Sequence, residues 1–400
     1  MKKLLLFFLV FIVLFQHSKL TAQDNRGQYP TLLRNGFFEV NIGYINYPFS
    51  VKQLEPGYTV ESIQVPHTAV RINLGYNFNE YFSFILGYMR PILWVRYKNV
   101  NGDGRNHPVF MNVGSTTLKG ELPFGEKFSI YGEGGMGLIT RSGFHVSNEP
   151  DQIIVKDATF ATVLMGAGIK YKPNARWGIM LNTAYTPPHS KTDQPRTTFF
   201  SAGFSFAMKP LPVEKVEASE NSKYIFPHNM IQLCYTTNAF GYGVNNFVSE
   251  GKIPIFWGGK AEVRSGISVH YQRNVFHTRK TFALDWGASF SYYKTENTEE
   301  NFWALSLFPV FRFTVLHLSP FDLYFNYSLA GPTFISDIDI DGEETGPKFT
   351  FQDFMGMGFF FGKTRKINAE IRIAHYSNGN LFPQNAGVKI PLTFNMGYTF

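Results

Sequence analysis

The segment "AVRINLGYNFN", residues 69–79, alternates apolar and polar side chains with a period of two. Successive side chains of an extended strand point to opposite faces. One face would carry Val70, Ile72, Leu74, Tyr76 and Phe78, and the other Arg71, Asn73, Gly75 and Asn77. An apolar outer face and an inner face of polar and small residues are what the wall of a transmembrane β-barrel requires. The segment therefore predicts a membrane-spanning all-β fold.

The composition supports the same fold class. Of 400 residues, 17% are aromatic and 17% are charged, whereas soluble domains average about 25% charged residues. The mean hydropathy is nevertheless −0.13, which argues against a bundle of apolar transmembrane helices. Many aromatic residues, few charges and a middling hydropathy are typical of barrel strands, which are apolar on one face only.

The first residues predict export. Residues 1–22 resemble a secretory signal peptide, with Lys2 and Lys3 before a twelve-residue apolar core and a cleavage site near Ala22. The core is shorter than the roughly 20 residues that a membrane-spanning helix needs. Cys234 is the single cysteine, so no disulfide can form within the chain. An exported barrel implies the outer membrane of a Gram-negative bacterium.

The alternating pattern occurs in two sets of eight segments. Short turns such as 79–80, 123–126 and 172–175 alternate with long polar loops, as in outer-membrane barrels with short periplasmic turns and long extracellular loops. The first set lies near 36–46, 68–79, 81–97, 108–121, 126–142, 157–172, 176–188 and 196–208. The second set lies near 229–243, 258–273, 280–294, 300–315, 321–334, 347–361, 366–378 and 389–400.

These sets predict two tandem eight-stranded antiparallel barrels. Residues 23–208 would form the first barrel, 209–224 a polar periplasmic linker, and 225–400 the second barrel. One sixteen-stranded barrel, with the linker as a long periplasmic turn, is the alternative. Side chains fill the interior of an eight-stranded barrel, which argues against a diffusion porin. The C-terminal Phe400 resembles the signal that the outer-membrane assembly machinery reads.

Neither nucleic acid nor a cofactor is expected as a partner. The net charge is +7, but the basic residues are scattered, without a basic helix or an RNA-binding motif. The motif "DIDIDG", residues 337–342, matches the opening of a calcium loop, but Lys348 occupies the position of its final acidic ligand. A solvated loop is therefore favoured over a loosely bound cation, and we expect no metal site.

A histidine and a serine stand at the end of the seventh strand of the second set. Ile367, Ala369, Ile371 and Ile373 form its apolar face, and His375 and Ser377 continue the same parity. Residues two apart on a strand lie about 6.6 Å apart at their Cα atoms, so an imidazole can reach a serine hydroxyl. A serine becomes a useful nucleophile when an adjacent base takes its proton. The pair therefore predicts a base and a nucleophile that face the lipid.

The string "HYSNGNLFPQNAG", residues 375–387, resembles the active-site stretch of the PagL-type lipid A 3-O-deacylases, roughly H-x-S-N-x(6)-N-x-G. The resemblance covers about 225–400, whereas the first half resembles a generic small outer-membrane barrel. It implies an eight-stranded enzyme that hydrolyses an ester-linked acyl chain of lipopolysaccharide without a metal. It further implies that His375 is the general base, Ser377 the nucleophile, Asn385 an oxyanion donor, and Asn378 a second amide that helps there or orients the loop.

The sequence departs from this family at one position. The family has a glutamate fourteen residues after the histidine, where this chain has Lys389, and a cation cannot stabilise an imidazolium as a carboxylate does. Asp353 on the preceding strand shares the outward parity of His375. In an unsheared hairpin the two would stand opposite each other, about 5 Å apart. Our hypothesis is that Asp353 replaces the missing acid.

Two functions follow from these residues. The first is an outer-membrane esterase that acts on lipid A or lipopolysaccharide. The alternative is a catalytically inactive structural or adhesion barrel that lost its acid, with Lys389 as the supporting feature.

Overall fold

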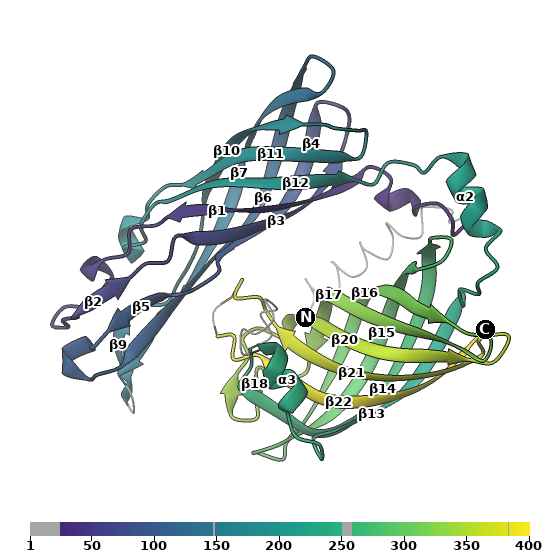
Figure 1. Cartoon of the computed structure of the whole chain (residues 1–400). Coiled ribbons are helices and arrows are strands. Elements are labelled where there is room, and N and C mark those ends of the chain that lie inside the picture. Colours follow the sequence, from purple (N-terminus) through teal and green to yellow (C-terminus); the bar gives the residue numbers. More distant parts are fainter. Residues whose placement is uncertain (1–24, 147–148, 250–257, 383) are drawn as a thin grey trace, which may run out of the picture.

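The computed structural model describes residues 25–146, 149–249, 258–382 and 384–400. The chain forms two closed, eight-stranded antiparallel barrels (Figure 1). Two tandem barrels were predicted, and this fold class is confirmed; the sixteen-stranded alternative is wrong because each set of strands closes on itself. The predicted signal peptide lies outside the described residues. Within the described ranges, no helix is both long and apolar enough to cross a membrane.

The N-terminal barrel closes when its last strand, β12, pairs with β1. Its walls are β1 (Gly36–Asn46), β3 (Thr68–Asn77), β4 (Phe82–Pro91), β6 (Asn106–Phe124), β7 (Phe128–Ser142), β10 (Ala158–Tyr171), β11 (Trp177–Thr186) and β12 (Thr197–Ala207). The long loops carry β2 (Ser62–Gln64), β5 (Val95–Lys98), β8 (Phe144–Val146) and β9 (Glu149–Val155), with short 3₁₀ turns at Val51–Gln53, Val100–Gly102 and Ser190–Thr192. These additions lie at one end of the barrel, which is the extracellular end because the long loops gather there.

The C-terminal barrel closes between β13 and β22. Its walls are β13 (Asn229–Thr237), β14 (Ala261–His277), β15 (Phe282–Thr295), β16 (Asn301–His317), β17 (Phe321–Ile335), β20 (Phe349–Phe361), β21 (Ile367–Ser377) and β22 (Val388–Thr399). The β17–β20 loop carries β18 (Asp339–Ile340) and β19 (Glu343–Glu344). Because β13 ends early, β14 also meets β22 in a short parallel pairing at the extracellular rim, where Ala261 faces Val388.

Three predicted segments differ from the structure. The strand expected over 81–97 ends at Pro91, and the chain continues in the separate rim strand β5. The strand expected over 229–243 ends at Thr237, and the chain turns at Gly241, whose φ of +67° suits a residue without a Cβ, before α3 (Gly243–Phe247). The segment between the barrels, expected to be a polar linker, contains the helix α2 (Val213–Glu220). Neither helix is long enough to give a clear periodic pattern in the sequence.

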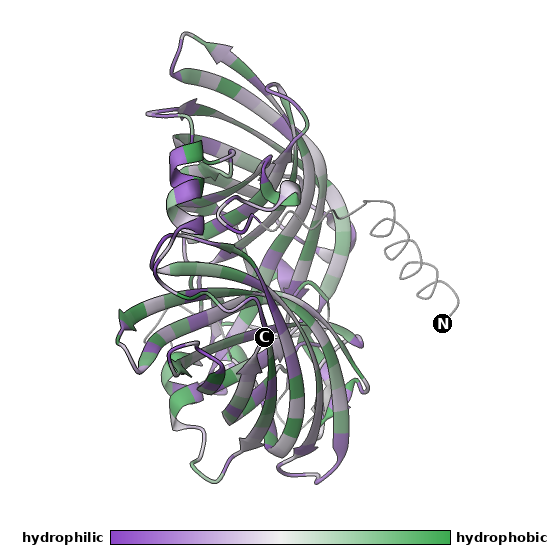
Figure 2. Cartoon of the chain, turned by 90° about the vertical axis from the view of Figure 1, so that its right-hand side faces the viewer, coloured by the Kyte–Doolittle hydropathy of each residue, from purple (hydrophilic) through white to green (hydrophobic). Residues whose placement is uncertain are grey.

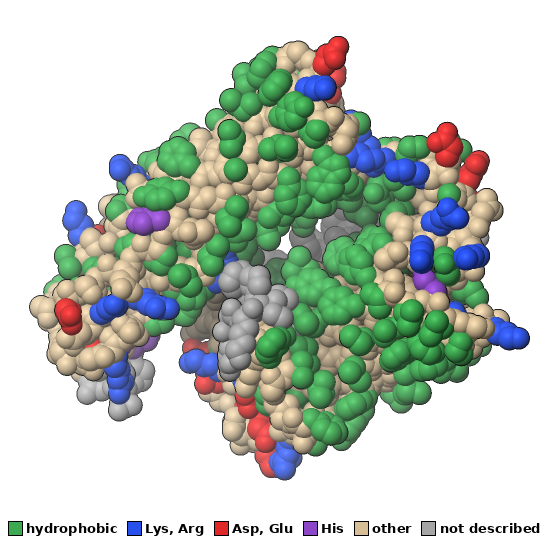
Figure 3. All heavy atoms as spheres, in the orientation of Figure 1, with side chains coloured by type: hydrophobic (Ala, Val, Ile, Leu, Met, Phe, Trp, Pro, Cys, Tyr) green, Lys and Arg blue, Asp and Glu red, His purple; other side chains and the backbone are tan. Residues whose placement is uncertain are grey.

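The period-two pattern appears directly on the walls. Figure 2 shows hydrophobic and hydrophilic residues alternating along the strands of both barrels. Exposed hydrophobic side chains such as Leu74, Leu118 and Met396 point outward, and in Figure 3 such side chains cover much of the visible outer surface while charged groups gather toward the barrel ends. The protein therefore presents an apolar wall to the membrane, as expected of a multi-pass outer-membrane barrel.

Ion pairs fill the lumen of the N-terminal barrel. Arg71 Nη1 lies 2.5 Å from Glu133, and Lys119 Nζ lies 2.5 Å from Glu39. All four side chains are buried. Buried charges need partners of opposite sign, so these pairs fix which residues of each strand point inward.

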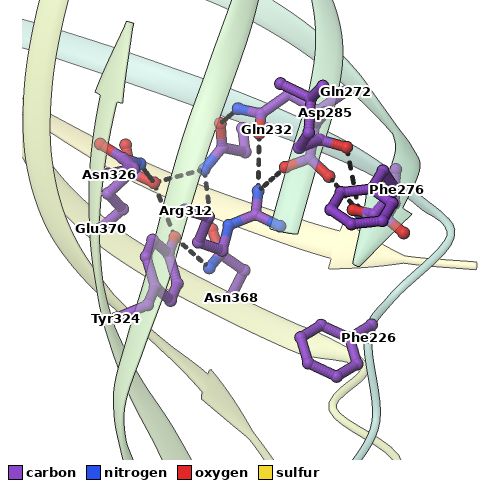
Figure 4. A network of polar contacts seen from close by, with 12 residues as sticks. Phe226, Gln232, Gln272, Phe276, Asp285, Arg312, Tyr324, Asn326, Asn368 and Glu370 are labelled. Atoms are coloured by element: carbon purple, nitrogen blue, oxygen red, sulfur yellow. Dashed lines mark hydrogen bonds and ion pairs between the residues drawn. The ribbon is translucent and has the colours of Figure 1, made fainter. Parts of the chain in front are cut away.

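A larger polar network fills the C-terminal barrel (Figure 4). Its centre is the Glu370 carboxylate on β21, which accepts hydrogen bonds from Tyr324 (2.6 Å), Asn326 (2.8 Å) and Asn395 (3.0 Å). Arg372 pairs with the same carboxylate through its Nε at 2.6 Å. Because Glu370 and Arg372 point inward, the alternate residues of β21 point outward.

Substitution of Arg372 tests this network. Arg372→Met leaves a buried Glu370 charge without its cationic partner, so we expect the free energy of unfolding in lipid vesicles to fall by roughly 3–5 kcal/mol. The matched control is Arg264→Met at the rim, where the ion pair with Glu299 is exposed; no measurable change is expected there. Equal losses in the two variants would contradict a central role for the lumenal network.

Candidate active site

His375 and Ser377 lie at the extracellular end of β21, where that strand pairs with β20. In this pairing Asp353 faces His375, and Phe351 faces Ser377. The register expected from the sequence is therefore confirmed. The parity also agrees, because the neighbouring Gln352 and Tyr376 are buried lumenal residues. Base, nucleophile and candidate acid thus share one outward face of adjacent strands, while their chemical roles stay predictions.

Asp353 also holds the neighbouring strand. Its Oδ1 accepts a hydrogen bond from the Ala330 backbone N–H at 2.6 Å. Ala330 has a φ of +52° and belongs to an irregularity in the β17–β20 pairing between Ser328 and Gly331. The Asp353 carboxylate thus accepts a hydrogen bond from a backbone N–H at the point where the regular β17–β20 pairing is interrupted. A carboxylate accepts several hydrogen bonds, so this contact leaves capacity for another partner.

His375 points outward but is buried, with 2% of its surface exposed. Its Nε2 lies 2.8 Å from the backbone carbonyl oxygen of Gly258. A carbonyl can only accept, so Nε2 carries the proton and Nδ1 holds the lone pair of the neutral ring. Gly387 lies against this contact, because a Cβ there would stand 2.7 Å from the Gly258 oxygen and 3.1 Å from Nε2. The ring is therefore held by backbone from two loops.

The β13–β14 loop covers the wall beside His375. Val248, which follows α3, packs on Ile373 of β21, with Tyr327, Met355 and Leu392 around them. The Asn245 amide of α3 donates to the Ile390 carbonyl of β22 at 2.8 Å, and Figure 1 shows α3 against the outside of the barrel near β22. The sequence predicted a wall open to lipid at this height; part of it is instead covered by the chain's own loop.

The two predicted amide residues organise the loop that follows Ser377. Asn385 Oδ1 accepts from the Asn378 backbone N–H at 2.9 Å, and Asn385 Nδ2 donates to Asn380 Oδ1 at 2.8 Å. Gly379 and Asn380 both have positive φ, +63° and +54°, so the chain turns sharply there. Asn385 therefore ties the two ends of the loop together, and its Nδ2 has a second N–H for another acceptor.

Lys389 stands where the family has its acid, and a partner neutralises it. Lys389 is the cross-strand neighbour of His375 on β22. Its Nζ lies 2.5 Å from Glu262 and 5.0 Å from the centre of the Tyr242 ring. Burial, together with the Glu262 charge, raises the pKa of the Tyr242 hydroxyl, which keeps its proton and donates to the Val263 carbonyl at 2.5 Å. The Glu262 carboxylate therefore holds the Lys389 ammonium group toward β14.

Sequence reasoning missed Gly258, Tyr242 and Glu262. All three reach the site from the loop between β13 and β14 or from the start of β14, far from residues 375–387 in the sequence. The parallel pairing of β14 with β22, which brings Glu262 beside Lys389, has no periodic signal. The one sequence feature that pointed to this ion pair was Glu262, an acidic residue near the start of a strand.

Charge reversal tests the Lys389–Glu262 pair. Lys389→Glu places two carboxylates together and should lower the unfolding free energy, whereas the double variant Lys389→Glu/Glu262→Lys restores the attraction. Because both side chains are partly buried, 13% and 28% exposed, a double-mutant cycle should give a coupling of about 1 kcal/mol. Strictly additive effects of the two substitutions would show that the pair contributes nothing.

Comparisons with known proteins divide the chain in the same way. Residues 265–399 match the family model Lipid A 3-O-deacylase (PagL), and residues 9–207 match the model Outer membrane protein beta-barrel domain. No curated protein sequence matches the chain.

Among solved structures, the outer membrane enzyme PagL is 18% identical, covering 43% of this chain and 99% of its own, with a TM-score of 0.30. Neisserial surface protein A is 12% identical (43% and 97%, TM-score 0.29), and the N-terminal β-barrel domain of Pseudomonas aeruginosa OprF is 13% identical (43% and 97%, TM-score 0.27). By its fold and the two family models, the protein is an outer-membrane protein of two β-barrels; its N-terminal half matches the outer membrane β-barrel model and its C-terminal half the PagL model.

Proposed function

We propose that the C-terminal barrel is an outer-membrane esterase that removes an ester-linked acyl chain from lipid A or lipopolysaccharide. The observation that carries the proposal is the outward pair of His375 and Ser377 at the extracellular end of β21, inside the segment that matches the PagL family model. Lipid A is a membrane lipid, so a site on the outer wall needs no internal pocket.

The reaction begins with attack of Ser377 Oγ on the acyl carbonyl carbon while His375 Nδ1 takes the hydroxyl proton. The tetrahedral oxyanion is held by the second N–H of Asn385 Nδ2, with Asn378 as a further amide nearby. His375 then returns the proton to the departing sugar alkoxide, which leaves an acyl-serine. Water attacks this ester with His375 again as base, and the fatty acid is released.

Asp353 stabilises the imidazolium in this scheme. It is the cross-strand neighbour of His375 on β20, whereas the Lys389 charge on the other side is paired with Glu262. The Gly258 carbonyl holds the ring through Nε2. The Asp353 carboxylate on one side and the Gly258 carbonyl on the other favour the protonated ring. They thereby take the role of the glutamate that the family has at the position of Lys389.

The acyl chain lies along the outer wall beside Ser377. Phe351 is the cross-strand neighbour of Ser377, and Phe349, 46% exposed, follows on the same face. The two rings contact each other with centroids 5.4 Å apart. This apolar strip lies at the extracellular end of β20, beyond the part of the wall that α3 and Val248 cover.

Phe400 is proposed to be read by the outer-membrane assembly machinery. Its backbone N–H and carbonyl pair with Asn229, each at 3.0 Å, which closes the barrel. Its side chain is 56% exposed at the end of β22, where a partner can reach it.

Loss of the nucleophile is the first test. In cells that produce the Ser377→Ala variant, the lipid A mass spectrum should lack the species that is lighter by one acyl chain and that appears with the unaltered protein. Ser222→Ala, in the segment between the barrels, is the matched control and should leave the spectrum unchanged. If the unaltered protein and Ser377→Ala give the same spectrum, the C-terminal barrel is an inactive scaffold, as the alternative suggested by Lys389 holds.

Asp353→Asn tests the acid. Asparagine keeps an oxygen that accepts from the Ala330 N–H, so the substitution removes the charge and preserves the bulge. We expect the deacylation rate in purified outer membranes to fall by at least about tenfold, with unaltered barrel stability. Undiminished activity would show that another group stabilises the imidazolium.

A further inference from the structure

A polar patch interrupts the outer wall of the N-terminal barrel near its extracellular end. Tyr88 of β4, Asn112 of β6 and Thr140 of β7 point outward, because Met89, Val113 and Ile139 beside them are buried in the interior. Polar groups on a lipid-facing wall carry a desolvation cost. Yet Asn112 and Thr140 are only 1% and 2% exposed, so something other than lipid covers them.

The covering segment is the β21–β22 loop of the C-terminal barrel. The Tyr88 hydroxyl lies 2.8 Å from the Gly379 carbonyl oxygen, with Asn112 Oδ1 2.9 Å from the same hydroxyl. Thr140 Oγ1 donates to the Leu381 carbonyl at 3.1 Å. Two backbone carbonyls of the loop thus lie within hydrogen-bonding distance of hydroxyl groups on the other barrel.

The wall is also shaped to receive this loop. Gly114 of β6 points outward between these polar residues, and a Cβ at Gly114 would stand 2.9 Å from Leu381 Cδ2. A larger residue would therefore push Leu381 away. Gly134 of β7 also points outward on this wall, but a Cβ there would meet nothing within 4 Å, so close contact is confined to the extracellular end.

The docked loop is the one that follows Ser377. Gly379 comes directly after Asn378, whose backbone N–H is held by Asn385. We infer that the outer wall of the N-terminal barrel is a docking surface for the loop Gly379–Leu381, and that Tyr88 and Thr140 are positioning residues for the candidate site. The docking stands on the contacts alone, whereas the positioning role rests on the proposed esterase function.

Disulfide cross-linking tests the docking in the full-length protein in outer membranes. In a Cys234→Ser background, Gly114→Cys/Leu381→Cys should cross-link under mild oxidation. A protease site inserted between the barrels, after α2, gives the readout: after cleavage, the cross-linked chain stays at full length on a non-reducing gel and separates on reduction. Gly134→Cys/Leu381→Cys is the matched control and should separate without reduction. Gly114 faces Leu138 of β7, and Gly134 lies four residues farther along that strand, about 13 Å away. Separation of both pairs, or equal cross-linking of both, overturns the docking.

Removal of single hydroxyl groups tests the positioning. Tyr88→Phe and Thr140→Val should each lower the 114–381 cross-linking yield and the Ser377-dependent deacylation rate by about two- to tenfold. Thr140→Ser keeps the donor and should restore both, and Tyr76→Phe, on the outer wall near the other barrel end, should change neither. Heat-modified mobility on gels confirms that each variant is folded. If the cross-link forms and neither measurement responds to Tyr88→Phe or Thr140→Val, these residues have no positioning role. If Ser377→Ala shows that the protein has no deacylase activity, the proposed function fails, while the cross-linking yields still decide the docking.

Discussion

The buried Glu370 carboxylate determines which way β21 faces, and the candidate site depends on that orientation. Tyr324, Asn326, Asn395 and Arg372 all converge on it inside the barrel. A slip of one residue would turn this charge toward lipid and carry His375 and Ser377 into the lumen. The cost of an unpaired carboxylate in the membrane excludes that register. The lumenal network therefore holds Ser377 and His375, the proposed nucleophile and base, on the outer wall.

The extracellular rim adds what the regular wall lacks. β13 ends at Thr237, so the chain is free to fold back as α3 and to return as β14 alongside β22. This arrangement brings the Gly258 carbonyl to His375 and Glu262 to Lys389. The lysine that breaks the family pattern is therefore neutralised by a carboxylate from another strand, and its presence does not place a bare cation beside the imidazole. The early end of one strand links the fold to the electrostatics of the site.

The walls were predictable from the sequence, and the loops were not. Period-two alternation and short periplasmic turns determine most strand bounds and the register between neighbouring strands. Accordingly, β1 begins and ends at the expected residues, and Asp353 lies opposite His375 on the adjacent strand, as predicted. The cover over His375, the Glu262–Lys389 pair and the docking of Leu381 involve long loops. Their contacts join residues far apart in the sequence, and the hydrophobic periodicity does not predict them. The segment 229–243 shows the limit, because the chain leaves the sheet after Thr237, before the expected end of the strand.

The N-terminal barrel contributes contacts that hold the loop after Ser377. Among the described residues of the loop 378–387, four have a positive φ, namely Gly379, Asn380, Gln384 and Gly387. A non-glycine residue in that conformation costs free energy and persists only where its surroundings hold it. Asn385 holds the loop from within, while Tyr88 and Thr140 hold it from the other barrel. An isolated C-terminal barrel would keep the first set of contacts and lose the second. The ordering of the loop next to Ser377 therefore depends on contacts from both barrels, which is the positioning role that we propose for the N-terminal barrel.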